Sequence, residues 1–184
     1  LHYFFEGAFD WLIIITILLT FYYLFMSIAV MFRKKPKLDI LERGKEPFVT
    51  IQIPTYNELA ALNCAQRCLD FDYPKDRVQI IIGDDSKDKR VSRKIDDFAK
   101  KHKLITVTRR GNNTGFKPGN LNHMLKYTKG DYIVIFDSDF LPGKNFLRRI
   151  MAPFVKDEKT SVVQARWKIN NFSQNIYSVL GGTI

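Results

Sequence analysis

Two aspartates, Asp137 and Asp139, follow an apolar run, YIVIF, and are separated by one residue. On an extended backbone, side chains at i and i+2 point to the same side of the chain, with their Cα atoms roughly 7 Å apart. Two carboxylates at that spacing can share a cation, and their hard oxygens suit Mg²⁺ or Mn²⁺ held partly by water and phosphate. The pair therefore predicts a metal site, although turn-forming aspartates are also common where strands end.

A second stretch suited to chemistry is GNNTGFKPGNLN, which begins at Gly111. Its glycines let the backbone approach a ligand closely, and Lys117 supplies a point charge for phosphate. Pro118 suits the first turn of a helix, whose N-terminal N–H groups would face an anion. The stretch lacks the P-loop pattern, so a P-loop nucleotidase is not indicated. A long connecting loop with turn glycines remains the alternative.

Polar residues also follow two other apolar runs. IIIG is followed by Asp84 and Asp85, whose carboxylates could accept hydrogen bonds from a nucleobase N–H or a ribose hydroxyl. TIQIP is followed by Thr55 and Tyr56, one suited to hydrogen bonding and the other to packing on a base. The alternatives are turn chemistry for the acidic pair and a helix N-cap role for Asn57.

These residues need a scaffold that brings them together, and the sequence predicts one. Short β-branched runs alternate with helix-like segments, which is typical of right-handed crossovers and a mainly parallel α/β sheet. The carboxyl ends of such strands form one edge, where ligands bind, so we expect one shared site. The predicted strands cover 48–53, 78–83, 104–109, 131–136 and 161–167, and the predicted helices lie near 57–70, 91–101, 118–128 and 144–155.

The N-terminal part of the chain predicts a membrane span. Residues 11–32 carry no charged side chain, and at about 1.5 Å per residue they reach roughly 33 Å as a helix. A signal peptide is the alternative, but its apolar region would be shorter and preceded by basic residues. RKKPK follows the span, so the positive-inside rule predicts residues 1–10 outside, a basic juxtamembrane linker at 33–47 and a cytosolic domain at 48–184.

The amino-acid composition limits the classes of molecule that the protein is expected to bind. The 184 residues carry a net charge of +10, from 29 Lys and Arg against 19 Asp and Glu, which fits anionic lipid, a phosphorylated substrate or nucleic acid. Clusters such as KDKRVSRK and KKHK are typical of solvated helix faces, so we expect no nucleic-acid partner. Cys64 and Cys68 are predicted to be reduced core residues, because too few histidines accompany them for a zinc site.

Four motifs in order, TIQIPTYNE, IIGDDSKD, NTGFKPGNLN and IFDSDFLP, together resemble the processive family 2 glycosyltransferases of the cellulose synthase, hyaluronan synthase and glucan or mannan synthase type. The resemblance covers about residues 48–167 and implies a GT-A type, Rossmann-like fold. It implies a membrane enzyme that transfers a sugar from a UDP-sugar, with Mg²⁺ or Mn²⁺, to a growing polysaccharide with inversion.

The resemblance also implies roles for single residues. Asp137 and Asp139 would hold the cation, and Lys117 would meet the diphosphate. Gln164, Arg166 and Trp167 are weaker candidates for the acceptor side. The residues implied in donor nucleotide binding are Thr55, Tyr56, Glu58, Asp84, Asp85, Lys117 and Asp137.

The general base that such a transfer needs is expected beyond Ile184, since no Asp or Glu follows Glu158. The chain is therefore interpreted as the donor-binding fragment of a longer enzyme. A glycosyltransferase acting on a lipid acceptor, such as a polyprenyl phosphate or ceramide, would have a similar donor half. A non-catalytic nucleotide-sugar-binding subunit is the third alternative.

Overall fold

The computed structural model describes residues 2–32 and 39–165, with side chains from Gly7 onward. The chain divides into two compact units, Leu1–Leu38 and Asp39–Ile184.

The first unit contains helix α1, His2–Phe32. Its part from Gly7 to Phe32 has a mean hydropathy of 2.4 and is long and apolar enough to cross a membrane. Inside it, the hydroxyls of Thr16, Thr20 and Ser27 each donate to the carbonyl oxygen four residues earlier, at 2.8 Å. These bonds satisfy the polar side chains within the helix, which an apolar environment requires.

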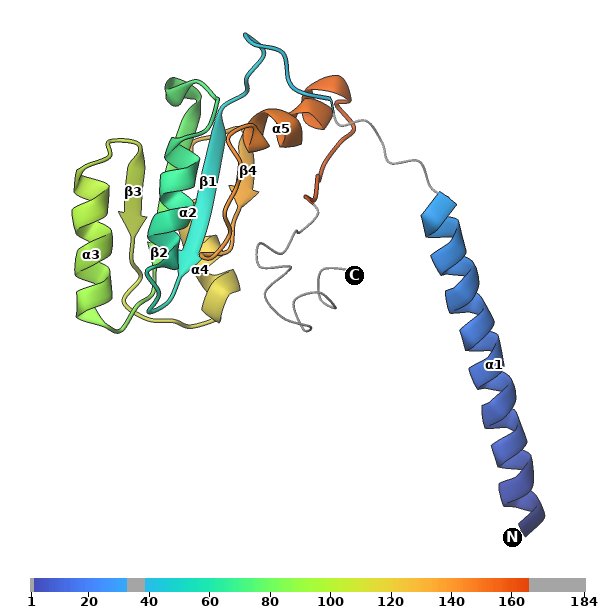
Figure 1. The fold of residues 1–184 in the computed structure, drawn as a ribbon. Helices are drawn as coiled ribbons and strands as arrows, with labels where there is room; N and C mark the ends of the chain where they lie inside the picture. The colour runs from blue at the N-terminus through green and yellow to red at the C-terminus, as the bar shows by residue number, and fades with distance from the viewer. Residues whose placement is uncertain (1, 33–38, 166–184) are drawn as a thin grey trace, which may run out of the picture. The chain divides into compact units, whose positions relative to one another are not determined.

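The second unit is built on a four-stranded sheet with the strand order β3-β2-β1-β4, in which all three pairings are parallel (Figure 1). The strands are β1 Val49–Thr55, β2 Val78–Asp84, β3 Ile105–Thr108 and β4 Tyr132–Ile135. Each strand is formed by one of the β-branched runs. The mainly parallel sheet predicted from the sequence is confirmed. Because the strands are parallel, their carboxyl ends lie at one edge.

Helices cover both faces of this sheet. The helices are α2 Ala60–Leu69, α3 Lys89–Lys100, α4 Phe116–Leu125 and α5 Phe146–Lys156, with a short 3₁₀ turn, η1, at Lys75–Arg77. Ile80 and Ile82 of β2 belong to a core that also contains residues of α2, α3 and α5. Gly83 faces the other way, against Asn120 and Met124 of α4. Alternate side chains of β2 thus pack against the helices on opposite faces of the sheet.

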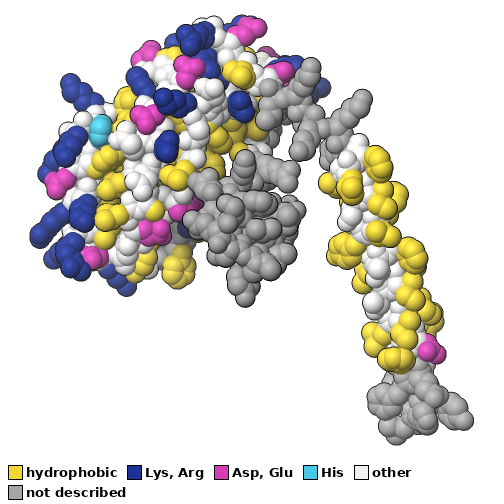
Figure 2. Space-filling model, viewed as in Figure 1, with side chains coloured by type: hydrophobic (Ala, Val, Ile, Leu, Met, Phe, Trp, Pro, Cys, Tyr) yellow, Lys and Arg dark blue, Asp and Glu magenta, His cyan; other side chains and the backbone are white. Residues whose placement is uncertain are grey.

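Cys64 and Cys68 are buried on α2 as free thiols, as the sequence predicted. Burial raises the pKa of Cys68, and the neighbouring Cys64 adds to the shift, so this thiol stays protonated. The basic clusters are also exposed as predicted. Figure 2 shows Lys and Arg side chains gathered over α3, on the left of the view.

Two boundaries differ from the predictions. Residues 161–165 form no strand, and Arg166 and Trp167 lie outside the described residues. Val162 is 83% exposed, and residues 161–165 line a groove beside β4 and α5 without joining the sheet. The composition of this stretch alone favoured a strand.

The predicted linker 33–47 is too long, because residues from Asp39 onward pack on α5. The Leu41 N–H donates to the Arg148 carbonyl at 3.0 Å, and the Lys156 ammonium pairs with Asp39 at 2.8 Å. Glu46 forms a buried ion pair with Arg148 at 2.7 Å. These contacts make 39–47 part of the second unit.

Candidate functional site

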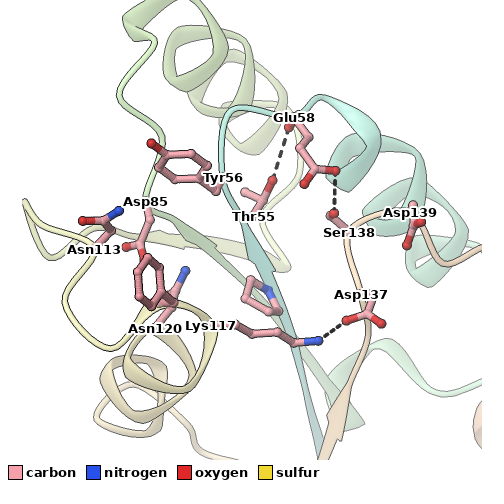
Figure 3. A pocket seen from close by; sticks show the side chains of 12 residues that line it. Thr55, Tyr56, Glu58, Asp85, Asn113, Lys117, Asn120, Asp137, Ser138 and Asp139 are labelled. Atoms are coloured by element: carbon pink, nitrogen blue, oxygen red, sulfur yellow. Dashed lines mark hydrogen bonds and ion pairs between the residues drawn. The ribbon is translucent and has the colours of Figure 1, made fainter.

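A pocket of about 580 Å³ opens at the carboxyl ends of β1, β2 and β4 and at the start of α4 (Figure 3). Four connections that are far apart in the sequence contribute to it, as parallel strands require. Its lining is Pro54, Thr55, Tyr56, Glu58, Asp85, Asn113, Phe116, Lys117, Asn120, Asp137, Ser138 and Asp139. Of the residues predicted for the donor site, only Asp84 is missing from this lining.

The two aspartates after β2 are separated by the structure. The Asp84 side chain is fully buried and outside the pocket lining, where it accepts hydrogen bonds from the Arg109 Nε at 2.8 Å and from the Ser86 N–H at 3.0 Å. Asp85, the next residue, lines the pocket. The expectation that both carboxylates face a nucleotide is therefore corrected, since neighbouring residues at a strand end point to opposite sides.

Burial acts to raise the pKa of Asp84, but hydrogen bonds from Ser86, Ser92 and Arg109 outweigh it and hold the pKa below its ordinary value. The unfolded pKa is about 3.9, so the stabilisation is present above that pH and is lost as the pH falls through the lower folded pKa. We expect Asp84→Asn to cost about 2 kcal/mol near pH 7, because Arg109 loses the buried one of its two carboxylate partners and keeps only Asp96. Thermal unfolding should show a gap between the variant and the wild type at pH 7 that narrows below pH ~4. A gap that is the same at both pH values would contradict this assignment.

Arg110 connects two parts of the pocket wall, and no functional role was predicted for it from the sequence. Its Nε lies 3.0 and 3.1 Å from the two carboxylate oxygens of Asp85, and its Nη2 lies 2.5 Å from one of them. The same side chain donates to the Phe116 carbonyl at 2.9 Å and to the Thr114 carbonyl. Hydrogen bonding to Asp85 raises the pKa of Arg110. One guanidinium thus joins the end of β2 to the glycine-rich loop.

A signal for this pairing exists in the sequence. Arg109 and Arg110 directly follow β3, while Asp84 is the last residue of the neighbouring β2 and Asp85 follows it. Opposite charges at the ends of adjacent parallel strands are close enough to pair.

The start of α4 is held tightly against the sheet. The Asn120 amide donates to the Gly83 carbonyl at 2.7 Å, inside the protein. Gly115 precedes the helix at φ +70°, and Phe116 follows it at φ +47°. A left-handed backbone is costly for an aromatic residue, yet Phe116 is 75% exposed and lines the pocket.

The loop after β1 forms the opposite wall. Thr55 is buried, and its hydroxyl lies 3.3 Å from the Glu58 carbonyl. Ser138, between the two aspartates, donates to a Glu58 carboxylate oxygen at 2.9 Å. Tyr56 is 42% exposed and presents its ring to the pocket (Figure 3). Asn57 does not cap α2, which begins after Leu59, but accepts from the N–H groups of Lys87 and Asp88.

Asp137 and Asp139 both line the pocket, but the backbone between them is a turn. β4 ends at Ile135, and the Phe140 N–H donates to the Asp137 carbonyl at 3.0 Å. The extended geometry assumed from the sequence is therefore wrong. Asp137 forms an ion pair with Lys117, and the two side chains point toward each other in Figure 3.

The residues present fit a hydrated divalent ion. Asp137 and Asp139 offer hard oxygens to one pocket, and Mg²⁺ or Mn²⁺ commonly takes its other ligands from water and substrate phosphate. Within residues 7–32 and 39–165, no group of three or more His, Cys, Asp or Glu could hold a metal. A substrate would have to complete the coordination.

Of the predicted acceptor-side residues, only Gln164 is described. It lines a second, mainly apolar groove of about 450 Å³ between β4 and α5. Lys117 and Asp137 line this groove as well as the first pocket, so the two cavities adjoin at their ion pair.

Comparison with known proteins places this site in a family. Residues 50–181 match the sequence profile of glycosyl transferase family 2. The chain belongs to glycosyltransferase family 2. Its sheet and flanking helices are GT-A-like: a mannosyltransferase from Pyrobaculum calidifontis, solved with GDP-Man and Mn²⁺, superposes with a TM-score of 0.59 at 28% identity, covering 70% of this chain and 39% of that one.

Family 2 relatives of this chain include polysaccharide synthases. Glucomannan 4-beta-mannosyltransferase 7 of Arabidopsis thaliana is 32% identical over 174 residues, covering 82% of this chain and 31% of the relative. The UDP-forming cellulose synthase catalytic subunit of Pseudomonas fluorescens is 36% identical over 138 residues, covering 72% of this chain and 18% of the relative. The chain thus spans less than a third of the length of either relative.

Proposed function

We propose that this chain is the donor-binding part of a membrane-bound, inverting glycosyltransferase that extends a polysaccharide from a UDP-sugar. The observation that carries the proposal is the pocket, in which an aromatic ring, a carboxylate, a lysine and two further aspartates meet at the carboxyl edge of a family 2 sheet. Two relatives of the chain are named for glucomannan and cellulose synthesis, which supports a polysaccharide as the acceptor.

In the proposed complex, each residue acts according to its position. Tyr56 stacks on the nucleobase, and Asp85, held by Arg110, accepts a hydrogen bond from a base N–H. Asp84 supports this wall from inside the protein and does not touch the donor. Lys117 binds the diphosphate, and Thr55 and Glu58 shape the floor with Ser138.

Asp137 and Asp139 hold Mg²⁺ or Mn²⁺ in this proposal. A divalent ion bound there stabilises the negative charge that develops on the departing nucleoside diphosphate. The chain's own contribution is to place the donor between Tyr56, Asp85 and Lys117, with the sugar toward the apolar groove that Gln164 lines. The general base and the rest of the acceptor site are proposed to lie outside the described residues, with Arg166 and Trp167 as acceptor-side candidates.

We also propose that helix α1 anchors the chain in the cell membrane. The proposed orientation has the pocket on the cytoplasmic side; it is supported by the basic residues 33–37, because positive juxtamembrane charge is retained on that side.

A GDP-sugar is the second candidate donor. It is favoured by one observation, the likeness to a mannosyltransferase that was solved with GDP-Man and Mn²⁺. The UDP-forming cellulose synthase relative points to the uridine nucleotide instead.

The proposal is tested by calorimetric titration of the full chain, in detergent, with UDP and with GDP. We expect UDP to bind in the presence of Mn²⁺, and at least about tenfold more weakly when EDTA replaces the ion, because two aspartates face the phosphates. Asp157→Asn, an exposed aspartate outside the pocket, is the matched control and should leave both affinities unchanged. Binding of GDP alone would transfer the proposal to a GDP-sugar, and binding of neither nucleotide would refute it.

A further inference from the structure

Lys117 and Asp137 form an ion pair that lines the pocket. The proposed function assigns them to different ligands, the lysine to the donor diphosphate and the aspartate to the divalent ion. Their ion pair means that neither ligand can take its partner without breaking the contact.

Resting on the proposed function, we infer that Lys117 occupies the cation position at Asp137 until the donor arrives, so that the divalent ion binds well only together with the nucleotide. Lys117 thereby couples the two binding events. It is a positioning residue for the ion in addition to a ligand for the phosphate.

The exchange requires only side-chain rotation, because both backbones are fixed. Lys117 lies in the first turn of α4, which is anchored through Asn120 to Gly83 and through the Phe116 carbonyl to Arg110. Its side chain is 49% exposed, so it can swing from Asp137 toward the open pocket. Rotations of this kind in exposed side chains take nanoseconds or less and do not limit binding.

The turn that carries Asp137 is fixed as well. The Phe140 N–H closes it, and Ser138 is held by Glu58. The Asp137 side chain is 33% exposed, and its carboxylate stays in the pocket when Lys117 leaves.

The charges around Asp137 determine whether the Lys117 ammonium or the divalent ion is bound to its carboxylate. An ion that arrives alone has the carboxylates of Asp137 and Asp139 as its proposed protein ligands, and it must displace the Lys117 ammonium that is paired with Asp137. A nucleoside diphosphate changes this balance, since its oxygens attract Lys117 and also provide further ligands for the ion. Each ligand therefore favours the other, and the coupling is reciprocal.

The test is the variant Lys117→Gln, measured against two ligands separately. Mn²⁺ binding to the nucleotide-free chain is followed by electron paramagnetic resonance of the free ion, and UDP binding is measured in EDTA. We expect Lys117→Gln to bind Mn²⁺ about three- to fivefold more tightly than the wild type. This factor corresponds to the free energy of a partly exposed ion pair, which the ion no longer has to break. The same variant should bind UDP more weakly in the absence of metal.

Two further variants identify the site. Lys126→Gln changes an exposed lysine at the other end of α4 and should alter neither affinity. Asp137→Asn should abolish the gain in Mn²⁺ affinity when combined with Lys117→Gln, because the gain requires the freed carboxylate.

The opposite signs separate this inference from a purely structural role, in which damage to the pocket would weaken both ligands. If Lys117→Gln binds Mn²⁺ no more tightly than the wild type, the inference is overturned, whereas UDP binding by the wild type would leave the proposed function intact. If the wild type binds neither UDP nor GDP with Mn²⁺, the proposed function fails first, and the inference fails with it.

Discussion

Arg110→Met is expected to destabilise the chain by about 3 kcal/mol and to weaken UDP binding by at least tenfold. The side chains of Arg110 and Asp85 are only 11% and 6% exposed, so removing the guanidinium leaves a nearly buried carboxylate without its charge partner. The carbonyls of Thr114 and Phe116 lose a donor at the same time. Chemical denaturation followed by circular dichroism measures the first effect, and calorimetry measures the second.

A double variant distinguishes the ion pair from a general loss of packing. Asp85→Asn combined with Arg110→Met removes both charges, so it should recover part of the lost stability without recovering UDP binding. Arg90→Met is the matched control, since Arg90 is 87% exposed beside Asp88 and should change the free energy of unfolding by less than ~0.5 kcal/mol. If the two arginine variants were equally mild, Arg110 would not be holding the pocket wall.

Gly119→Ala is expected to weaken UDP binding by about tenfold or more, although alanine favours helices. A Cβ at this position would lie 2.2 Å from the Thr114 carbonyl oxygen and 2.4 Å from an Arg110 nitrogen. The Thr114 oxygen is part of the backbone, so the glycine-rich loop must move away from α4 and carry Arg110 with it. The cost is that of overpacking, about 1–3 kcal/mol, and it exceeds the gain of about 1 kcal/mol from helix propensity.

Gly143→Ala is the control for this substitution. No atom lies within 4 Å of a Cβ built at Gly143, so both stability and nucleotide affinity should be unchanged. Should Gly119→Ala prove more stable than the wild type with normal UDP affinity, the close approach of loop and helix would be wrong.

The sequence predicted the fold better than it predicted the site, for a physical reason. Repeated apolar runs and helix patterns determine the layers, and all four strands of the parallel sheet were located to within about two residues. Which side chain faces the pocket depends instead on the residue at which each strand ends. Asp84 and Asp85 differ by one position and both side chains are nearly buried, yet only Asp85 lines the pocket.

The aspartates after β4 illustrate the same limit. Their spacing suggested an extended pair, but β4 ends two residues before Asp137, and the chain then turns. Arg110 was missed because its main partner, Asp85, follows a different strand, and only the order of the strands brings the two together, whereas Thr114 and Phe116 lie in the connection that follows Arg110. Leu41 was assigned to a linker, since a polar segment with one buried leucine has no periodic pattern to show that it packs on a helix.

Phe116 has a further consequence for how this pocket is maintained. A residue with a Cβ pays conformational energy at φ +47°, and glycine or asparagine would occupy that backbone with less strain. A sequence shaped by folding stability alone would therefore not place a large ring at this position and leave it exposed to water. Because Phe116 lines the pocket, a substitution that relieves the backbone strain there also changes the pocket surface, so a variant stabilised at other positions should retain Phe116.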